Sequence, residues 1–118
     1  MSETTQGQDR WNASLMPNYG TPNLVLDHGK GATVWDVDGN QLIDFAGGIG
    51  MVNLGHRPEA VVNAIKNQMD KYIHTGALVT TFEPYIEFAE MLNAITPGDF
   101  PKKTLLACSG SEAVENAI

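Results

Sequence analysis

Hydrophobic and polar positions follow a strand-like pattern in the first half of the chain. Residues 32–37 and 41–45 are two short, mainly apolar runs, and Asp38, Gly39 and Asn40 stand between them. An Asp-Gly pair between two such runs is a strong signal for a β-hairpin turn. The pattern therefore predicts a hairpin over residues 32–45.

The second half of the chain has a helical pattern instead. After Pro58, apolar residues recur at positions 61, 65, 69 and 72, which is the spacing of one helix face. Proline suits the start of a helix because its missing N–H would have no partner there. A second helix is expected around Pro84, with Thr80 and Glu83 at capping-box spacing before it. Its buried face is expected to hold Tyr85, Phe88, Ala89 and Leu92.

The last predicted unit is a strand that leads directly into a helix. Residues 103–108 form a nearly all-apolar run, which is typical of a strand covered on both faces. A small-residue turn follows at residues 109–111, and a third helix is expected from about Ser111. Strand, turn and helix make half of a βαβ unit, so the predicted fold class is α/β. We expect the neighbours of this strand to lie beyond residue 118.

In two segments the apolar positions follow neither a helical nor a strand-like period. Residues 1–31 read as a polar tail with a loose start, followed by an extended stretch whose prolines and glycine oppose regular helix. Residues 46–56 contain four glycines among apolar residues. That segment is too glycine-rich for a stable helix and too apolar for a solvated linker. It is therefore expected to be buried, or to lie close to another backbone or a ligand.

Composition and charge narrow the possible functions. The chain has 118 residues and a formal net charge of -7, so it is a poor partner for the phosphates of nucleic acids. It has no apolar stretch near the roughly 20 residues of a membrane span, and its N-terminus lacks the core of a signal peptide. The single cysteine, Cys108, cannot form an internal disulfide. Together these features predict a cytoplasmic protein that binds neither nucleic acid nor membrane.

The turn at residues 109–111 supports two interpretations. The free N–H groups and the dipole at a helix start attract a phosphate, and Gly110 would let the anion approach the backbone. A hydroxyl of Ser109 or Ser111 could donate a further hydrogen bond. However, Ser109 and Glu112 have capping-box spacing, and spacing alone favours a simple helix cap. The turn matches neither a P-loop nor the G-x-G-x-x-G pattern.

No metal-binding or nucleophilic constellation is recognisable in the sequence. His28, His56 and His74 are widely spaced, so they are expected to be surface or hydrogen-bonded structural residues, and we predict no metal site. Cys108 follows an apolar run and is expected to be a small buried hydrophobe. Three carboxylates of the hairpin region are expected to be turn and edge residues: Asp36, Asp38 and Asp44.

Two longer segments carry a specific order of motifs. They are VWDVDGNQLIDFAGGIGMVNLGH and GDFPKKTLLACSGSEAVENAI. The chain resembles class III aminotransferases, the fold type I enzymes that use pyridoxal phosphate, over about residues 11–118. The resemblance implies the N-terminal portion of that fold. Residues 1–50 would be a tail and hairpin segment of the small domain, and residues 51–118 the truncated start of the large cofactor-binding domain.

The resemblance also implies roles for individual residues. Gly110 and Ser111 match the pair that binds the cofactor phosphate, which reverses the preference for a simple cap. Ile49 matches an apolar residue that lines the substrate pocket, and Tyr19 matches a position near the substrate entrance of acetylornithine-like enzymes. In the family, the lysine that carries the cofactor lies further along. We therefore assign no catalytic residue.

The implied activity is transfer of an amino group from an ω-amino acid, similar to 4-aminobutyrate, to 2-oxoglutarate. The alternative within the family is an acetylornithine or succinyldiaminopimelate aminotransferase. The resemblance further implies small amino-acid and 2-oxo-acid substrates and a homodimer or dimer of dimers. The 118-residue chain alone is expected to be inactive. A different class also stays open, namely a non-catalytic folding fragment or a module that binds a phosphate ligand.

Overall fold

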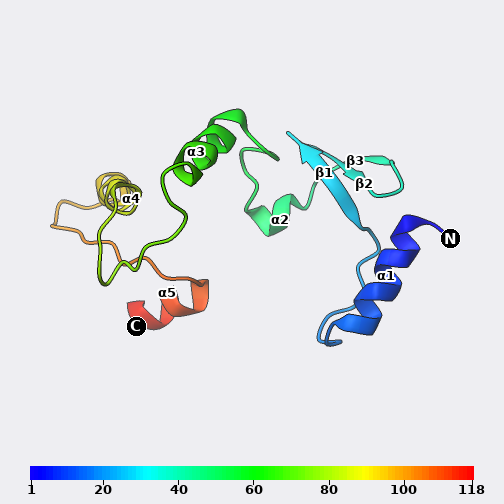
Figure 1. The fold of residues 1–118 in the computed structure, drawn as a ribbon. Helices are drawn as coiled ribbons and strands as arrows, with labels where there is room; N and C mark the ends of the chain where they lie inside the picture. The colour runs from blue at the N-terminus through cyan, green and yellow to red at the C-terminus, as the bar shows by residue number, and fades with distance from the viewer. The chain divides into compact units, whose positions relative to one another are not determined.

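The computed structural model describes residues 1–118, which form two units, Met1–Asp70 and Lys71–Ile118. Each unit is described here by itself, and Figure 1 shows their elements in chain order. The predicted boundary near residue 50 concerns the domains of the complete family fold, and it stays a prediction.

A three-stranded antiparallel sheet is the centre of the first unit (Figure 1). The strands are β1 (Leu26–Lys30), β2 (Thr33–Asp36) and β3 (Gln41–Ile43), in the order β1-β2-β3. The predicted hairpin is confirmed as β2 and β3, which pair in a register that sets Val34 opposite Leu42. Gly39 has a φ of 85° in the turn between them, a value that favours glycine. The additional strand β1 lies in the stretch that was expected to be extended.

The N-terminal residues are not loose, so that prediction is wrong. They form helix α1 (Glu3–Ser14), whose N-cap is Ser2. The Ser2 hydroxyl accepts a hydrogen bond from the backbone amide of Thr5 at 3.1 Å. A second cap comes from Asp38, whose carboxylate accepts the amides of Glu3 at 2.7 Å and Thr4 at 3.2 Å. Because Asp38 is distant in sequence, local patterns at residues 1–11 do not contain this signal.

The glycine-rich segment forms a left-handed turn instead of a regular helix. Within the short turn α2 (Gly47–Gly50), Gly48 and Ile49 have φ values of 61° and 59°. The segment is not buried as a whole, because Ile49 is fully exposed. The expectation of a close backbone approach is confirmed at Gly55, where an added Cβ would lie 2.9 Å from the Gly31 backbone.

The predicted helices are present. Helix α3 (Glu59–Met69) begins directly after Pro58 in the first unit. In the second unit, α4 (Glu83–Ile95) has Pro84 in its first turn, and α5 (Gly110–Ala117) follows Ser109. The predicted capping box of α4 is wrong, because its N-cap is Phe82 and makes no side-chain cap. The Thr80 amide instead donates to the carbonyl of Gly76 at 2.9 Å.

No strand forms over residues 103–108, although the apolar run predicts one. A strand exists only with a hydrogen-bonded neighbour, and the sheet of this chain contains only β1, β2 and β3. Leu105 is 65% exposed, and Cys108 is exposed as well. The expectation of a buried Cys108 is therefore wrong for this chain.

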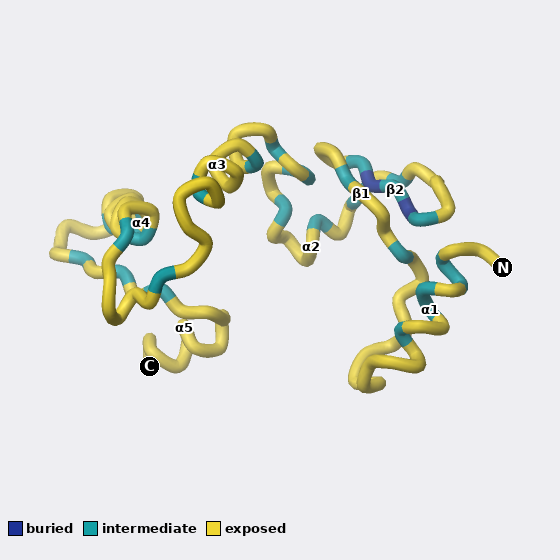
Figure 2. The backbone as a smooth tube through the Cα atoms, viewed as in Figure 1, coloured by how far each residue is buried: buried dark blue, intermediate teal, exposed yellow.

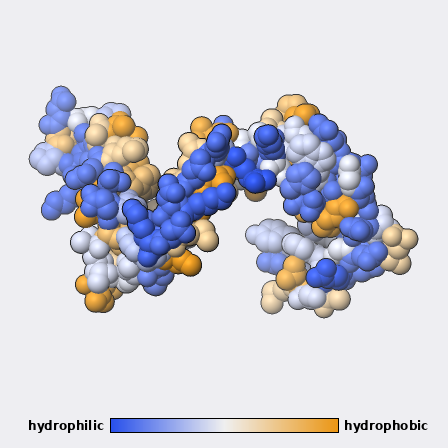
Figure 3. Space-filling model, turned by 45° about the horizontal axis from the view of Figure 1, so that its top comes forward, coloured by the Kyte–Doolittle hydropathy of each residue, from blue (hydrophilic) through white to orange (hydrophobic).

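The buried part of the molecule is very small. Only Val34 and Asp36, both on β2, are buried, as the dark blue positions in Figure 2 show. The helix faces predicted to be buried remain partly open, with Ile65 54% and Phe88 49% exposed. Apolar side chains consequently reach the surface of the chain, where Figure 3 shows them in orange.

Candidate functional site

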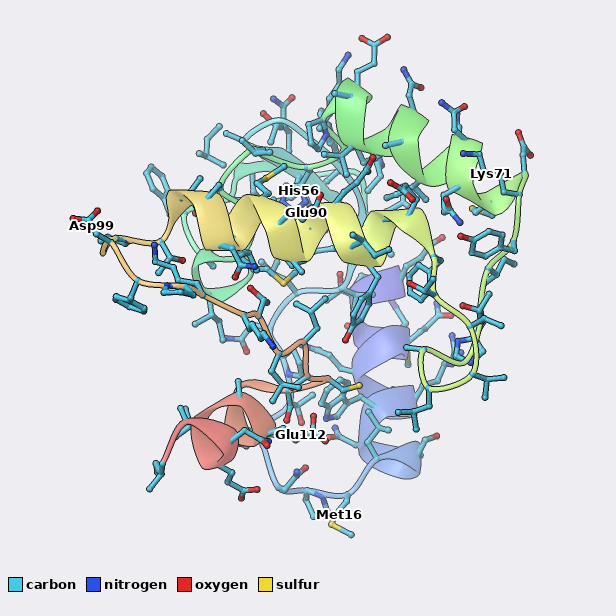
Figure 4. The ribbon with its side chains drawn as sticks, turned by 90° about the vertical axis from the view of Figure 1, so that its left-hand side faces the viewer. Met16, His56, Lys71, Glu90, Asp99 and Glu112 are labelled. Carbon is cyan, nitrogen blue, oxygen red and sulfur yellow. The ribbon has the colours of Figure 1, made fainter.

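The turn before α5 forms a complete capping box. The Ser109 hydroxyl accepts the amide of Glu112 at 3.2 Å. In return, the Glu112 carboxylate accepts the amides of Ser109 at 3.0 Å and Cys108 at 2.8 Å. Glu112 is labelled in the first turn of this helix in Figure 4. The cap suggested by the sequence spacing is therefore confirmed.

The cap leaves two amides of the helix start available. No hydrogen bond occupies the N–H groups of Gly110 and Ser111, which are the first two residues of α5. An added Cβ on Gly110 would meet no atom within 4 Å, so the space beside this backbone is open. Two free amides at the positive end of a helix dipole, with the Ser111 hydroxyl next to them, suit a phosphate group. The cap therefore leaves different N–H groups of the same turn free for an anion.

The two predicted substrate residues lie in the first unit. Ile49 is at the tip of the left-handed turn, and its side chain is 100% exposed. Tyr19 follows α1, is 77% exposed, and lines a surface hollow together with Trp11 and Leu15. Ile49 is not among the residues that line this hollow. Gly110 and Ser111 belong to the second unit, which is described by itself.

The pairing of Asp44 with His56 was not predicted from the sequence. Nε2 of His56 lies 2.6 Å from Oδ2 of Asp44, and both side chains are largely shielded, with 26% and 15% of their surface exposed. The hydrogen bond from the Gly47 amide, followed by the His56 side chain, lowers the pKa of Asp44 below its ordinary value of 3.8, while burial opposes the shift. Asp44 is therefore an ionised acceptor at neutral pH.

The sequence contained a signal for this pair. Asp44 begins the motif D-F-A-G-G-I, and His56 ends the motif L-G-H. Both motifs support the family resemblance, but spacing in sequence does not show that the segment between them folds back. That return is set by the backbone pairing of Gly31 with His56, which joins the segment to the end of β1.

The other predicted structural residues have local roles. His28 contacts the Asp27 carboxylate at 2.7 Å, and its ring stacks on Trp35 with centroids 4.6 Å apart. Asp36 accepts the amide of Asn40 at 2.7 Å within the hairpin turn. The predictions of a hydrogen-bonded structural histidine and of a turn carboxylate are confirmed at these positions.

The family follows from comparison with known proteins. A family model described as aminotransferase class-III matches residues 15–118. The chain belongs to the class III aminotransferases. These enzymes use pyridoxal phosphate, and the free amides of Gly110 and Ser111 are hydrogen-bond donors of a kind that fits a phosphate group. When bound, that cofactor supplies an electron sink for chemistry at the amino-bearing carbon of a substrate.

Individual relatives agree with this family. The chain is 53% identical over 95 residues to the 5-aminovalerate aminotransferase of Pseudomonas aeruginosa, covering 80% of this chain and 22% of that protein. It is 50% identical over the same length to the 4-aminobutyrate aminotransferase of Escherichia coli, with the same two coverages. The chain thus spans about a fifth of the length of these curated relatives.

Solved structures show the same fold. The acetylornithine aminotransferase of Elizabethkingia anophelis superposes with a TM-score of 0.87 at 29% identity, covering 99% of this chain and 30% of that one. The structure of this chain therefore corresponds to the N-terminal part of a fold type I aminotransferase. Among its helices, none combines the length and the apolar character needed to cross a membrane.

Proposed function

We propose that the whole protein transfers the amino group of an ω-amino acid to 2-oxoglutarate with pyridoxal phosphate. The observation that carries this proposal is the 53% and 50% identity to aminotransferases named for 5-aminovalerate and 4-aminobutyrate. Both named donors are linear and carry the amino group at the end opposite the carboxylate. A donor of this class would place an apolar carbon chain between its two charged ends.

The residues of this chain have distinct parts in the proposal. The amides of Gly110 and Ser111 and the Ser111 hydroxyl hold the cofactor phosphate at the start of α5, where no internal hydrogen bond competes for the two amides. The exposed side chain of Ile49 contacts the carbon chain of the donor. Tyr19 lies near the entrance of the substrate pocket. The groups that carry out proton transfer are not among the residues assigned here.

A second donor class has specific support. The acetylornithine aminotransferase of Mycobacterium leprae is 43% identical over 117 residues and aligns with 99% of this chain, whereas the two relatives with ω-amino acid names align with 80%. Its alignment therefore includes residues of this chain that the other two alignments leave out. This favours N-acetylornithine as the alternative donor.

The deciding experiment is an amino-transfer assay on the whole protein, loaded with pyridoxal phosphate. 4-Aminobutyrate, 5-aminovalerate and N-acetylornithine are compared as donors to 2-oxoglutarate by kcat/KM. We expect the two ω-amino acids to be preferred by at least about tenfold, the lower end of the discrimination that a size difference of one methylene gives in an apolar pocket. A preference for N-acetylornithine would support the alternative, and no transfer from any donor would contradict the proposed activity.

The same proposal includes a cytoplasmic homodimer as the working form. Large apolar side chains such as Phe88 and Leu105 are about half exposed or more, so further contacts have apolar surface to cover. We also propose that residues 1–118 alone do not transaminate. Amino transfer by a purified protein of only these residues would refute that statement and would favour a reassignment of the catalytic groups.

A further inference from the structure

The side chain of Asp44 closes the glycine-rich segment at both ends. Its Oδ1 accepts the amides of Ala46 at 3.0 Å and Gly47 at 2.9 Å. Its Oδ2 lies 2.6 Å from Nε2 of His56. Since an ionised carboxylate only accepts, the proton of this last bond belongs to Nε2. One side chain therefore ties the beginning of the segment to its end.

His56 is in turn fixed by the end of β1. Its amide donates to the carbonyl of Gly31 at 2.7 Å, and the Gly31 amide donates to the His56 carbonyl at 2.9 Å. A Cβ on Gly29 would lie 2.7 Å from Cγ of His56, so the imidazole packs directly on the strand backbone. The strand thus sets the position from which Nε2 reaches Asp44.

The segment that Asp44 closes holds Ile49 in an unfavourable conformation. The φ and ψ of Ile49 are 59° and 47°, in the left-handed region that a β-branched residue rarely adopts. Its side chain is 100% exposed, so no packing within the unit compensates for this conformation. A strained backbone that presents an exposed apolar side chain is a feature of ligand-contacting sites.

We propose that Asp44 and His56 are positioning residues, which hold the left-handed turn so that Ile49 meets the carbon chain of the amino donor. This inference rests on the proposed function, in which Ile49 contacts the carbon chain of the amino donor. Asp44 and His56 act through the backbone of residues 46 and 47 and do not touch the donor. When the pair is broken, the turn relaxes and Ile49 moves, so the enzyme discriminates less well between donors of different length.

The test compares His56→Phe with His28→Phe in the whole protein. Phenylalanine keeps a planar ring over Gly29 but removes the Nε2 donor. His28 is a matched control because it also contacts a carboxylate, that of Asp27, at 2.7 Å, and it lies on β1 outside the glycine-rich segment. The two variants remove the same chemical group from the same small sheet region.

The first measurement is amide hydrogen exchange at Ala46 and Gly47, which requires no substrate. Exchange should become at least about tenfold faster in His56→Phe and stay unchanged in His28→Phe, because only the first frees the Asp44 carboxylate. Equal exchange in the two variants overturns the proposal. A wild-type protein that transaminates no ω-amino acid would refute the proposed function and the substrate role together, while exchange still decides whether the pair holds the turn.

The second measurement is the ratio of kcat/KM for 5-aminovalerate and 4-aminobutyrate, which differ by one methylene. In His56→Phe the ratio should change by about fivefold or more, chiefly through KM, with kcat within about threefold of wild type. General loss of stability lowers both values in proportion and leaves the ratio unchanged. Faster exchange with an unchanged ratio therefore overturns the positioning role.

A second variant covers the case in which His56→Phe does not fold. Asp44→Asn keeps one side-chain oxygen for the amides of Ala46 and Gly47 but loses the charge that attracts the His56 proton. It should shift the substrate ratio in the same direction as His56→Phe, by a smaller factor. A folded Asp44→Asn protein with the wild-type ratio and wild-type exchange contradicts the proposal.

Discussion

The carboxylate of Asp38 accepts the backbone amide of Glu3 at 2.7 Å, although the two residues stand 35 positions apart. The same carboxylate accepts the amide of Thr4 at 3.2 Å. Two of the N–H groups that a helix leaves unpaired at its start are thus satisfied by the turn of the hairpin. The hairpin turn therefore adds to the cap that Ser2 provides at the start of α1.

Removal of this cap is expected to unfold the start of α1. In Asp38→Ala, helicity should fall by up to the signal of the 12 residues of α1, because the helix has no buried residue to hold it. Far-ultraviolet circular dichroism of the whole protein measures this loss. Asp9→Ala is the control, since it removes the same charge from within the helix, and its helicity should not fall. Equal helicity in both variants would show that the Ser2 cap suffices.

These interactions separate what the sequence could predict from what it could not. The hairpin followed from Asp38 and Gly39 because turn chemistry is local. Helix α3 followed from the spacing of its apolar face, and the cap of α5 followed from Ser109 and Glu112, again within a few residues. Elements that are determined by residues close together in the chain could therefore be predicted from the sequence.

The missed features depend on contacts that sequence spacing does not contain. Part of the cap of helix α1 comes from Asp38, and the pairing of His56 with Asp44 depends on the return of the segment to Gly31. The apolar run at residues 103–108 shows the opposite case, in which a local pattern predicts a strand but the chain provides no neighbour for it. A strand is a property of at least two segments, so one segment cannot fix it.

The acid titration of Asp44 offers a test of its hydrogen bonds. The Gly47 amide and then His56 hold the pKa of Asp44 below 3.8, so the bonds stabilise the fold above that pH and are lost as pH falls through the lowered folded value. The amide resonance of Gly47 should therefore titrate with a midpoint below 3.8. In His56→Phe the midpoint should rise toward the ordinary value. If the midpoint is the same in both proteins, His56 does not contribute to the lowered pKa of Asp44.

Packing of His56 on β1 predicts an asymmetry between two glycines. An alanine methyl at position 29 would lie 2.7 Å from Cγ of His56, whereas one at position 20 would meet nothing within 4 Å. Gly29→Ala should lower the free energy of unfolding by about 1–3 kcal/mol, the usual cost of an overpacked contact. Gly20→Ala should change it little. Denaturant unfolding of the whole protein measures both, and equal stabilities would mean that the ring moves aside without cost.

The two serines of the α5 turn are expected to differ in what they support. Ser109→Ala removes the hydroxyl that caps α5 by accepting a hydrogen bond from the Glu112 amide, and it should cost about 1 kcal/mol of stability. Ser111→Ala leaves the capping box intact and should weaken pyridoxal phosphate binding by about tenfold, as for loss of one hydrogen bond to a charged group. Spectral titration with the cofactor and thermal unfolding separate the two effects. If Ser109→Ala weakens cofactor binding and Ser111→Ala does not, the phosphate binds at Ser109.

Gly110 is expected to show opposite effects on stability and on binding. It begins α5 and has open space around its backbone, so alanine fits there and should stabilise the free protein by up to about 1 kcal/mol through better helix propensity. The new methyl would stand beside the two free amides and hinder a phosphate that approaches them closely. Gly110→Ala should therefore unfold at a higher temperature without cofactor and gain less stability when pyridoxal phosphate is added. An unchanged gain would mean that the phosphate does not approach this amide, and the helix start would then serve only as a cap.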